Sequence, residues 1–254
     1  IRDDNDTLQQ AGLSLSSELW MIVVDMIYQQ GGWLFSTDGR KAMLDTPLGR
    51  RALEEITDML YVDRISNLPG DPSVDIRKGN VGMLYKWAWY RGSLDAVPGL
   101  RYSSFAVPTF TGSPMPALGR NNYESGLSVP KNQDQAHRKA AFEFLAWLYD
   151  QDSYLLEINV RGGRIPGKTS LWRKDEVRKD HLMMILANAA PHTVFPGELP
   201  NYQWEKPLIE MSKGILRQTA APAALLEETQ RVVNTRLSEE PATWVVERRY
   251  DPVR

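Results

Sequence analysis

Two tryptophans near the end of an apolar run are the first residues in this sequence that could do chemistry. The segment Gly79–Trp89 is GNVGMLYKWAW, in which a glycine-containing turn precedes the apolar run Val81–Tyr85. Since side chains two apart share one face of a strand, a strand that continued past Tyr85 would place Trp87 and Trp89 on the same side. An indole is a flat apolar plate with one N–H donor, which suits the apolar face and hydroxylated rim of a sugar. The alternative, that both rings belong to a core, stays open.

Few other residues have the spacing of a catalytic or metal site. The sequence lacks cysteine, which excludes disulfides, thiolate zinc and cysteine nucleophiles. Its histidines have no metal-ligand spacing and are expected on the surface, and no phosphate loop, dinucleotide fingerprint or G-x-S-x-G elbow occurs. We therefore expect no metal, no cofactor and no catalytic residues.

A carbohydrate-active hydrolase is the enzyme alternative. It would need two carboxylates that face one sugar. The spacing of the candidate carboxylates selects no pair among Glu18, Asp75, Glu124 and Glu198.

The composition is that of an ordinary globular protein. Of 254 residues, 42% are hydrophobic and 24% charged, with a formal net charge of −2. Without a long basic run, a nucleic-acid surface is not expected. No run approaches the roughly 18 apolar residues of a membrane helix, and no signal peptide is visible. The start at Ile1, in a polar stretch without Met, indicates a truncation or processing point.

Helical patterns dominate the chain. Apolar residues at helical spacing predict a first helix from about Leu19, with Ser16 and Ser17 as N-caps and Gly31-Gly32 as its end. Thr46 can cap a second helix, with Pro47 at its first position. Later helices are predicted at Gln135–Tyr149 (capped by Asn132 or Asp134), Asp180–Ala190, Lys206–Arg217 and Pro222–Leu237.

Short strands and one irregular loop complete the prediction. Strands are expected at Val81–Tyr85, Tyr102–Val107 and Ser125–Val129. Glycines and a proline make Arg161–Gly167 an irregular loop. The fold class is α/β with helix in excess.

A series of segments, in order along the chain, resembles the extracellular solute-binding proteins of bacterial ABC importers, in particular the sugar-binding family that includes maltose-binding protein. The second helix and the strand that ends in a stacking tryptophan are two of them. The resembling segments are Gly31–Gly39, Asp45–Ser66, Gly79–Trp89, Glu124–Asn132, Ala136–Tyr149, Arg161–Pro166 and Ala220–Leu237.

The resemblance implies a two-lobed, periplasmic-binding-protein-like class II fold of which the N-terminal third is missing. Residues 1–122 and 179–254 would form most of the C-terminal lobe, and 123–178 a segment of the N-terminal lobe. Such a chain would expose apolar surface where the missing strands packed.

The resemblance also implies a site. The strand's stacking residue is Trp89 by the usual gap and Trp87 by the local W-A-W pattern, and both are kept. Trp204, in the segment PNYQW, resembles a late aromatic loop over the cleft. The remaining substrate-binding residues would be Tyr123, Glu124, Arg164, Trp20 and Glu18.

The implied function is that of a substrate-binding component, not an enzyme, which captures a sugar or oligosaccharide between two lobes and delivers it to the membrane permease. We expect a monomer that is periplasmic or extracellular, with a lipoprotein anchor as an open alternative. Glycerol phosphate, a polyamine or a metal chelate are alternative solutes, and Arg120, Arg161 and Arg164 leave room for an acidic sugar.

Overall fold

The structure is a computed structural model that describes residues 3–5, 9–15, 19–66, 76–110, 117–120, 127–131, 134–195, 201–239 and 248–249. The chain divides into two compact units. Unit 1 comprises Ile1–Trp87, Val107–Asn121 and Pro191–Arg254, and unit 2 comprises Ala88–Ala106 and Asn122–Ala190. The segment 123–178 falls within unit 2, which also takes up 88–106 and 179–190. The assignment of either unit to a lobe remains a prediction.

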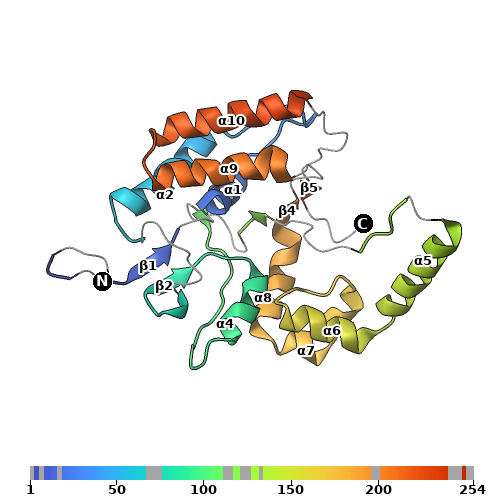
Figure 1. The fold of residues 1–254 in the computed structure, drawn as a ribbon. Coiled ribbons are helices and arrows are strands. Elements are labelled where there is room, and N and C mark those ends of the chain that lie inside the picture. Colours follow the sequence, from blue (N-terminus) through green and yellow to red (C-terminus); the bar gives the residue numbers. More distant parts are fainter. Residues whose placement is uncertain are drawn as a thin grey trace. The chain divides into compact units, whose positions relative to one another are not determined.

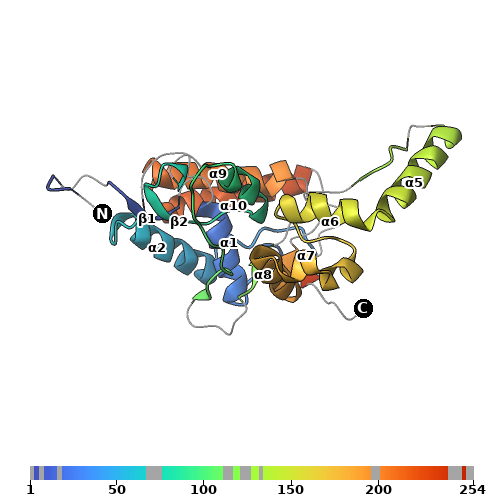
Figure 2. The same ribbon diagram turned by 90° about the horizontal axis from the view of Figure 1, so that it is seen from below.

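Unit 1 is built on helices that share one apolar core. Its principal helices, which pack against one another, are α1 (Leu19–Gln29), α2 (Pro47–Tyr61), α9 (Asn201–Leu216) and α10 (Pro222–Glu239) (Figure 1). They stay grouped when the view is turned (Figure 2). Almost every side chain of α1 is buried, as expected for a helix that is apolar nearly all round. The one acidic residue in α1, Asp25, is buried with them.

Two small sheets bring distant segments of unit 1 together. Strand β1 (Ala11–Ser14) pairs in parallel with β2 (Val81–Leu84), with Ala11 opposite Val81 and Ser14 opposite Leu84. The second sheet has the order β3 (Gly119–Arg120), β4 (Thr193–Phe195) and β5 (Arg248–Arg249). In it, β3 and β4 are parallel and β4 and β5 antiparallel. The sheets fix the backbone near Tyr85 and Arg120.

The regular elements in the described part of unit 2 are all helices. Its elements are the 3-10 helix η1 (Ala88–Tyr90), then α4 (Arg91–Asp95), α5 (Gln135–Tyr149), α6 (Asp152–Arg161), η3 (Thr169–Arg173), α7 (Asp175–Arg178) and α8 (His181–Ala189); η4 (Ala190–His192) follows α8. Its small core consists of Leu156, Leu171, Val177 and Met183.

The predicted starts of α2 and α5 are confirmed, whereas α9 begins at Asn201 and not near the predicted Lys206. Thr46 accepts a hydrogen bond from the Gly49 N–H at 3.2 Å and precedes Pro47, the first residue of α2. Asp134 caps α5 by accepting from the N–H groups of Ala136 and His137. These caps satisfy backbone donors that the first helical turn leaves unpaired.

The strand predictions hold only in part. The strand predicted at Val81–Tyr85 is one residue shorter than expected, and the other two predicted strands are not found in the described residues. Strand β2 stops at Leu84, because its partner β1 ends at Ser14. The segment Tyr102–Val107 has no strand assignment, since none of the described residues pairs with it as a ladder. The segment Ser125–Val129 lies partly outside the described residues, and 127–129 are not a strand. Helix α6 and strand β1 were not predicted.

Helix α5 exposes a large apolar surface. None of its side chains is buried, and Phe142, Phe144, Trp147 and Tyr149 are 56%, 56%, 57% and 53% exposed. A helix that is apolar on several faces is ordinarily covered by other protein.

Candidate functional site

Three of the predicted aromatic residues lie together in unit 1, around one arginine. Trp20 comes from the first turn of α1, Trp204 from the first turn of α9, Trp87 from the segment after β2, and Arg120 from the end of β3. We call these four residues the tryptophan cluster. The rings of Trp20 and Trp204 meet edge to face, with centroids 5.9 Å apart and planes at 78°. Phe35 packs edge-on against the other side of Trp204 at 6.3 Å.

The guanidinium of Arg120 is the centre of this cluster. Its central carbon Cζ lies 4.1 Å from the ring centroid of Trp20, 4.4 Å from that of Trp87 and 5.9 Å from that of Trp204. Such distances are those of cation–π contacts, which are strongest with indole rings and in desolvated places. Segments that are far apart in the sequence therefore converge on one charged group.

Asp25 anchors the backbone of Arg120 from behind the cluster. The Arg120 N–H donates to Asp25 Oδ1 at 2.7 Å, and the Tyr85 hydroxyl donates to Asp25 Oδ2. Burial raises the pKa of Asp25 to about 6, against the opposing effects of Tyr85 and the positive charge of Arg120. At neutral pH the carboxylate is thus mostly ionised, and its negative charge attracts the positive charge of the guanidinium.

The members of the cluster differ in their access to solvent. Trp20 is 2% and Trp204 3% exposed, and both belong to the core of unit 1, whereas Trp87 is half-buried. Trp87 is therefore the most exposed indole of the tryptophan cluster, and Trp20 and Trp204 lie on its buried side. The expectation that Trp204 lies in a loop is wrong, because helix α9 already begins at Asn201.

Trp89 lies apart from Trp87, in unit 2. The prediction that the two indoles share a strand face is wrong, since the strand ends at Leu84 and Ala88–Tyr90 turns into the helix η1. The Trp89 side chain is 40% exposed and packs edge-on against Tyr90, with ring centroids 6.1 Å apart. It is thus available to a solute but is not part of the tryptophan cluster.

The irregular loop Arg161–Gly167 packs closely against the backbone that carries Trp89. Gly163 has φ +65°, and a Cβ atom there would lie 2.1 Å from the carbonyl oxygen of Ala88. Only glycine fits such a backbone conformation and such a close approach without strain. Arg164 follows in this loop and is exposed. Trp89 and Arg164 therefore belong to the same small region of unit 2.

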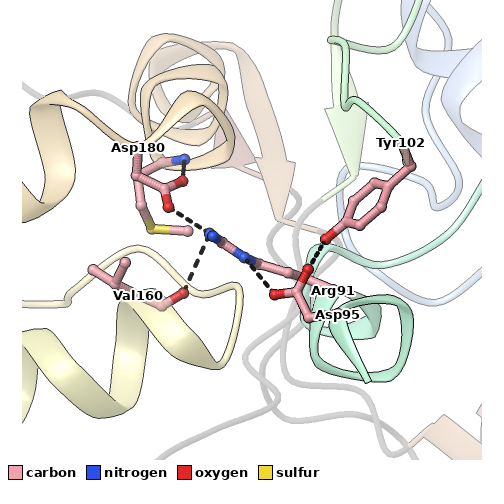
Figure 3. A network of polar contacts seen from close by, with 6 residues as sticks. Arg91, Asp95, Tyr102, Val160 and Asp180 are labelled. Atoms are coloured by element: carbon pink, nitrogen blue, oxygen red, sulfur yellow. Dashed lines mark hydrogen bonds and ion pairs between the residues drawn. The ribbon is translucent and has the colours of Figure 1, made fainter. Parts of the chain in front are cut away.

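A network of polar contacts fixes the region of Trp89 within unit 2 (Figure 3). Arg91 Nη1 lies 2.6 Å from Asp180 Oδ2 and 3.5 Å from the Val160 carbonyl oxygen, and its Nε lies 3.3 Å from Asp95 Oδ2. Asp180 also caps α8 through the Met183 N–H. Burial, together with the hydrogen bond that its hydroxyl donates to Asp95 at 2.5 Å, raises the pKa of Tyr102 to about 12. The network thus joins α4 to the end of α6 and the start of α8.

Several predicted residues fall outside the described residues. From the predicted sugar site these are Glu18, Tyr123 and Glu124. The other two carboxylates that were considered for a hydrolase, Asp75 and Glu198, also fall outside. Their roles stay predictions. Sequence reasoning missed the central position of Arg120 and the part played by Asp25. An acidic residue inside the apolar run of α1 was the available signal for Asp25.

A surface depression of the described structure and the potential metal ligands among its residues give no second candidate site. A polar depression on α10, whose lining includes Asp45, Glu227, Gln230 and Asn234, contains none of the predicted site residues. Across the described ranges, histidine, aspartate and glutamate side chains form no group that could hold a metal ion. Within the same part of the chain, no helix is long and apolar enough to cross a membrane.

Comparison with solved structures identifies the fold. The maltose/maltodextrin-binding domain MalE of Bdellovibrio bacteriovorus, bound to maltotriose, matches 91% of this chain with a TM-score of 0.70 and 17% identity. An ABC transporter solute-binding protein of Thermotoga lettingae, bound with α-D-tagatose, matches 92% with a TM-score of 0.67 and 17% identity. The sugar-binding protein MalE of Xanthomonas citri matches 93% with a TM-score of 0.69 and 15% identity.

These matches show that the chain has the fold of ABC transporter solute-binding proteins, as the sequence resemblance implied. The chain covers 60–61% of the length of the three structures. No protein-family model matches the sequence. No curated protein matches it either.

Proposed function

We propose that this chain is part of the substrate-binding component of an ABC transporter, and that its solute is a sugar or an oligosaccharide. The protein would capture the solute without altering it and deliver it to the transmembrane permease. The binding proteins of similar fold are described as bound to maltotriose, α-D-tagatose and ribitol, the last two as ABC transporter solute-binding proteins.

The observation that carries this proposal is the convergence of Trp20, Trp87 and Trp204 on Arg120 within unit 1. Aromatic rings with a few placed polar groups are the usual lining of a small-molecule site. Trp87, the half-buried ring, would stack on the apolar face of a sugar. The ligand-binding roles of Trp89 and Arg164 rest on the sequence resemblance alone.

Capture by closure of two lobes, binding to a permease, a monomeric state and a periplasmic or extracellular location all follow from the resemblance and remain part of the proposal. Binding energy that favours the closed form would supply the signal that the permease recognises. A hydrolase is the rival function and would need two carboxylates that face one sugar. Of the carboxylates near the tryptophan cluster, Asp25 already accepts from Arg120 and Tyr85.

A thermal-shift screen of the full-length gene product against maltotriose, D-tagatose, ribitol, spermidine and glycerol 3-phosphate tests the proposal. A ligand that binds only the folded state raises the unfolding temperature in a concentration-dependent way. We expect a shift with at least one carbohydrate and no release of sugar products on long incubation. A shift with spermidine or glycerol 3-phosphate alone, or turnover of a carbohydrate, would contradict it.

A further inference from the structure

Arg120 is a buried cation whose terminal nitrogens have no partner among the described residues. The whole residue is 9% exposed, and neither Nη1 nor Nη2 has a hydrogen-bond partner in the described structure. Burial lowers the pKa of Arg120, and the negative charge of Asp25 opposes that effect. Unpaired buried donors are costly to a folded protein. This arrangement therefore needs a reason other than stability.

The backbone of Arg120 is held in place, while the two terminal nitrogens of its side chain have no hydrogen-bond partner among the described residues. Its N–H donates to Asp25 Oδ1 at 2.7 Å, and its register in the second sheet places it opposite Val194 of β4. The rings of Trp20 and Trp87 contact the guanidinium through their faces, at 4.1 and 4.4 Å from Cζ. Contacts through the faces stabilise the positive charge but leave the in-plane N–H donors unused.

Two unused donors on one planar group fit two neighbouring oxygen atoms. A guanidinium binds such pairs in a bidentate way, whether they are adjacent hydroxyls or the oxygens of a carboxylate. Asp25 and Glu205 already place negative charge near the positive charge of Arg120. A pair of adjacent hydroxyls on an uncharged sugar therefore suits the site better than an anion.

We propose that Arg120 is a ligand-binding residue: Nη1 and Nη2 donate to two neighbouring oxygens of the sugar while Trp87 stacks on its ring. The proposal rests on the proposed function and adds a specificity-determining residue to it. Trp20 and Trp204 hold the guanidinium in position from the inner side of the tryptophan cluster.

The test compares Arg120→Met and Arg120→Lys in the full-length gene product. Methionine keeps an unbranched apolar stem and removes the donors, and lysine keeps the charge but loses the planar pair of donors. Arg51→Met is the matched control, because Arg51 also lies over an aromatic ring, Phe110, at 5.4 Å in unit 1, but is exposed. The probe is whichever of maltotriose, D-tagatose and ribitol the wild type binds most tightly, measured by titration calorimetry.

We expect Arg120→Met to weaken binding by about tenfold or more and Arg120→Lys by a smaller factor, as for the loss of one or two charge-assisted hydrogen bonds. The sugar-free unfolding temperature of Arg120→Met should stay close to that of wild type, because the removal of two unsatisfied buried donors offsets the loss of the positive charge beside Asp25. Binding within twofold of wild type in Arg120→Met would overturn the proposal. If that variant does not fold, wild-type affinity in Arg120→Lys would overturn it.

Two further comparisons separate the outcomes. The first compares the affinities of D-galacturonate and D-galactose in the wild type and in Arg120→Met. If the wild type binds D-galacturonate more tightly and this binding depends on Arg120, the oxygen pair is a carboxylate. If it binds D-galactose more tightly, the oxygen pair consists of hydroxyls. If the wild type binds no carbohydrate, the proposed function fails and this inference fails with it. If the wild type and Arg120→Met bind a sugar equally, only this inference fails.

Discussion

The Cζ atom of Arg120 lies 4.1 Å from the centre of the Trp20 ring, although the two residues belong to a strand end and a helix start that are far apart in the sequence. The contact joins the second sheet of unit 1 to helix α1. It also places a positive charge inside an aromatic wall that is otherwise apolar. The stability and the binding properties of unit 1 should both depend on how this charge is balanced.

The titration of Asp25 should show how the positive charge of Arg120 is balanced in the folded protein. Its pKa in the folded protein is raised to about 6 by burial, from 3.8. Between these two values the folded state binds more protons than the unfolded state, so the contribution of Asp25 to stability falls as pH rises from about 4 to 6. Replacement by Asn removes this dependence. The free energy of unfolding of wild type relative to Asp25→Asn should therefore fall by about 2–3 kcal/mol over that range.

Urea denaturation at a series of pH values from 4 to 7 measures this difference. Other carboxylates, such as Asp134 with its lowered pKa, titrate in both proteins and cancel in the comparison. A difference that rises with pH would mean that Asp25 is stabilised as a carboxylate in the folded state, contrary to the dominance of burial.

Trp204 should matter first for stability. Its ring is 3% exposed and contacts Trp20 and Phe35 edge to face. Trp204→Ala should cost about 3–5 kcal/mol of unfolding free energy, as for other large-to-small changes in a core. Trp204→Phe should recover much of that loss, because it keeps an aromatic ring. Equal stability of wild type and Trp204→Ala in urea denaturation would show that this ring is not part of the core.

The local structure of this chain was largely predictable, and its long-range contacts were not. Thr46, Pro47 and Asp134 act on neighbouring backbone groups, so their caps follow from the sequence. The end of β2 depends on Ser14, which lies far away along the chain and ends the partner strand. For the same reason the alternation in W-A-W gave the wrong relationship between Trp87 and Trp89.

The tryptophan cluster shows the same division. The types of Trp20, Trp87 and Trp204 indicated an aromatic site, but no local pattern places Arg120 between them. That position follows from the pairing of β3 with β4 and from the contact with Asp25. The near-complete burial of Trp20 and Trp204 did not follow from their spacing, because it depends on which elements pack on α1.

Arg91 should hold the described elements of unit 2 together. Its side chain is 24% and that of Asp180 15% exposed, so the ion pair lies between a surface pair and a buried one. Arg91→Ala should lower the free energy of unfolding by about 1–3 kcal/mol. Arg161→Ala is the control, because the Arg161–Glu157 pair is exposed on both sides and should change stability by less than about 0.5 kcal/mol. Similar losses in the two variants by urea denaturation would remove the special role of Arg91.

Gly163 should be required for the packing of the Arg161–Gly167 loop. Gly163→Ala combines a positive φ with a Cβ atom 2.1 Å from the Ala88 carbonyl oxygen. Gly99→Ala is the matched control, since Gly99 has φ +76° but no atom within 4 Å of its Cβ position. Both variants should lose about 1 kcal/mol through backbone strain, and Gly163→Ala about 1–3 kcal/mol more. Hydrogen exchange of the Ala88–Tyr90 amides should rise only in Gly163→Ala; equal behaviour of the two variants would contradict the close packing.

The most direct test of the central claim is calorimetric titration of the full-length protein and its Trp87→Ala variant with the carbohydrate found in the thermal-shift screen. Trp87 is half-buried, so its loss should leave the fold intact and weaken binding by about 1–3 kcal/mol, by analogy with the loss of aromatic stacking on a base. Trp33→Ala, with a ring 38% exposed in the same unit, should bind as wild type does. Unchanged affinity in Trp87→Ala would contradict a sugar site at the tryptophan cluster.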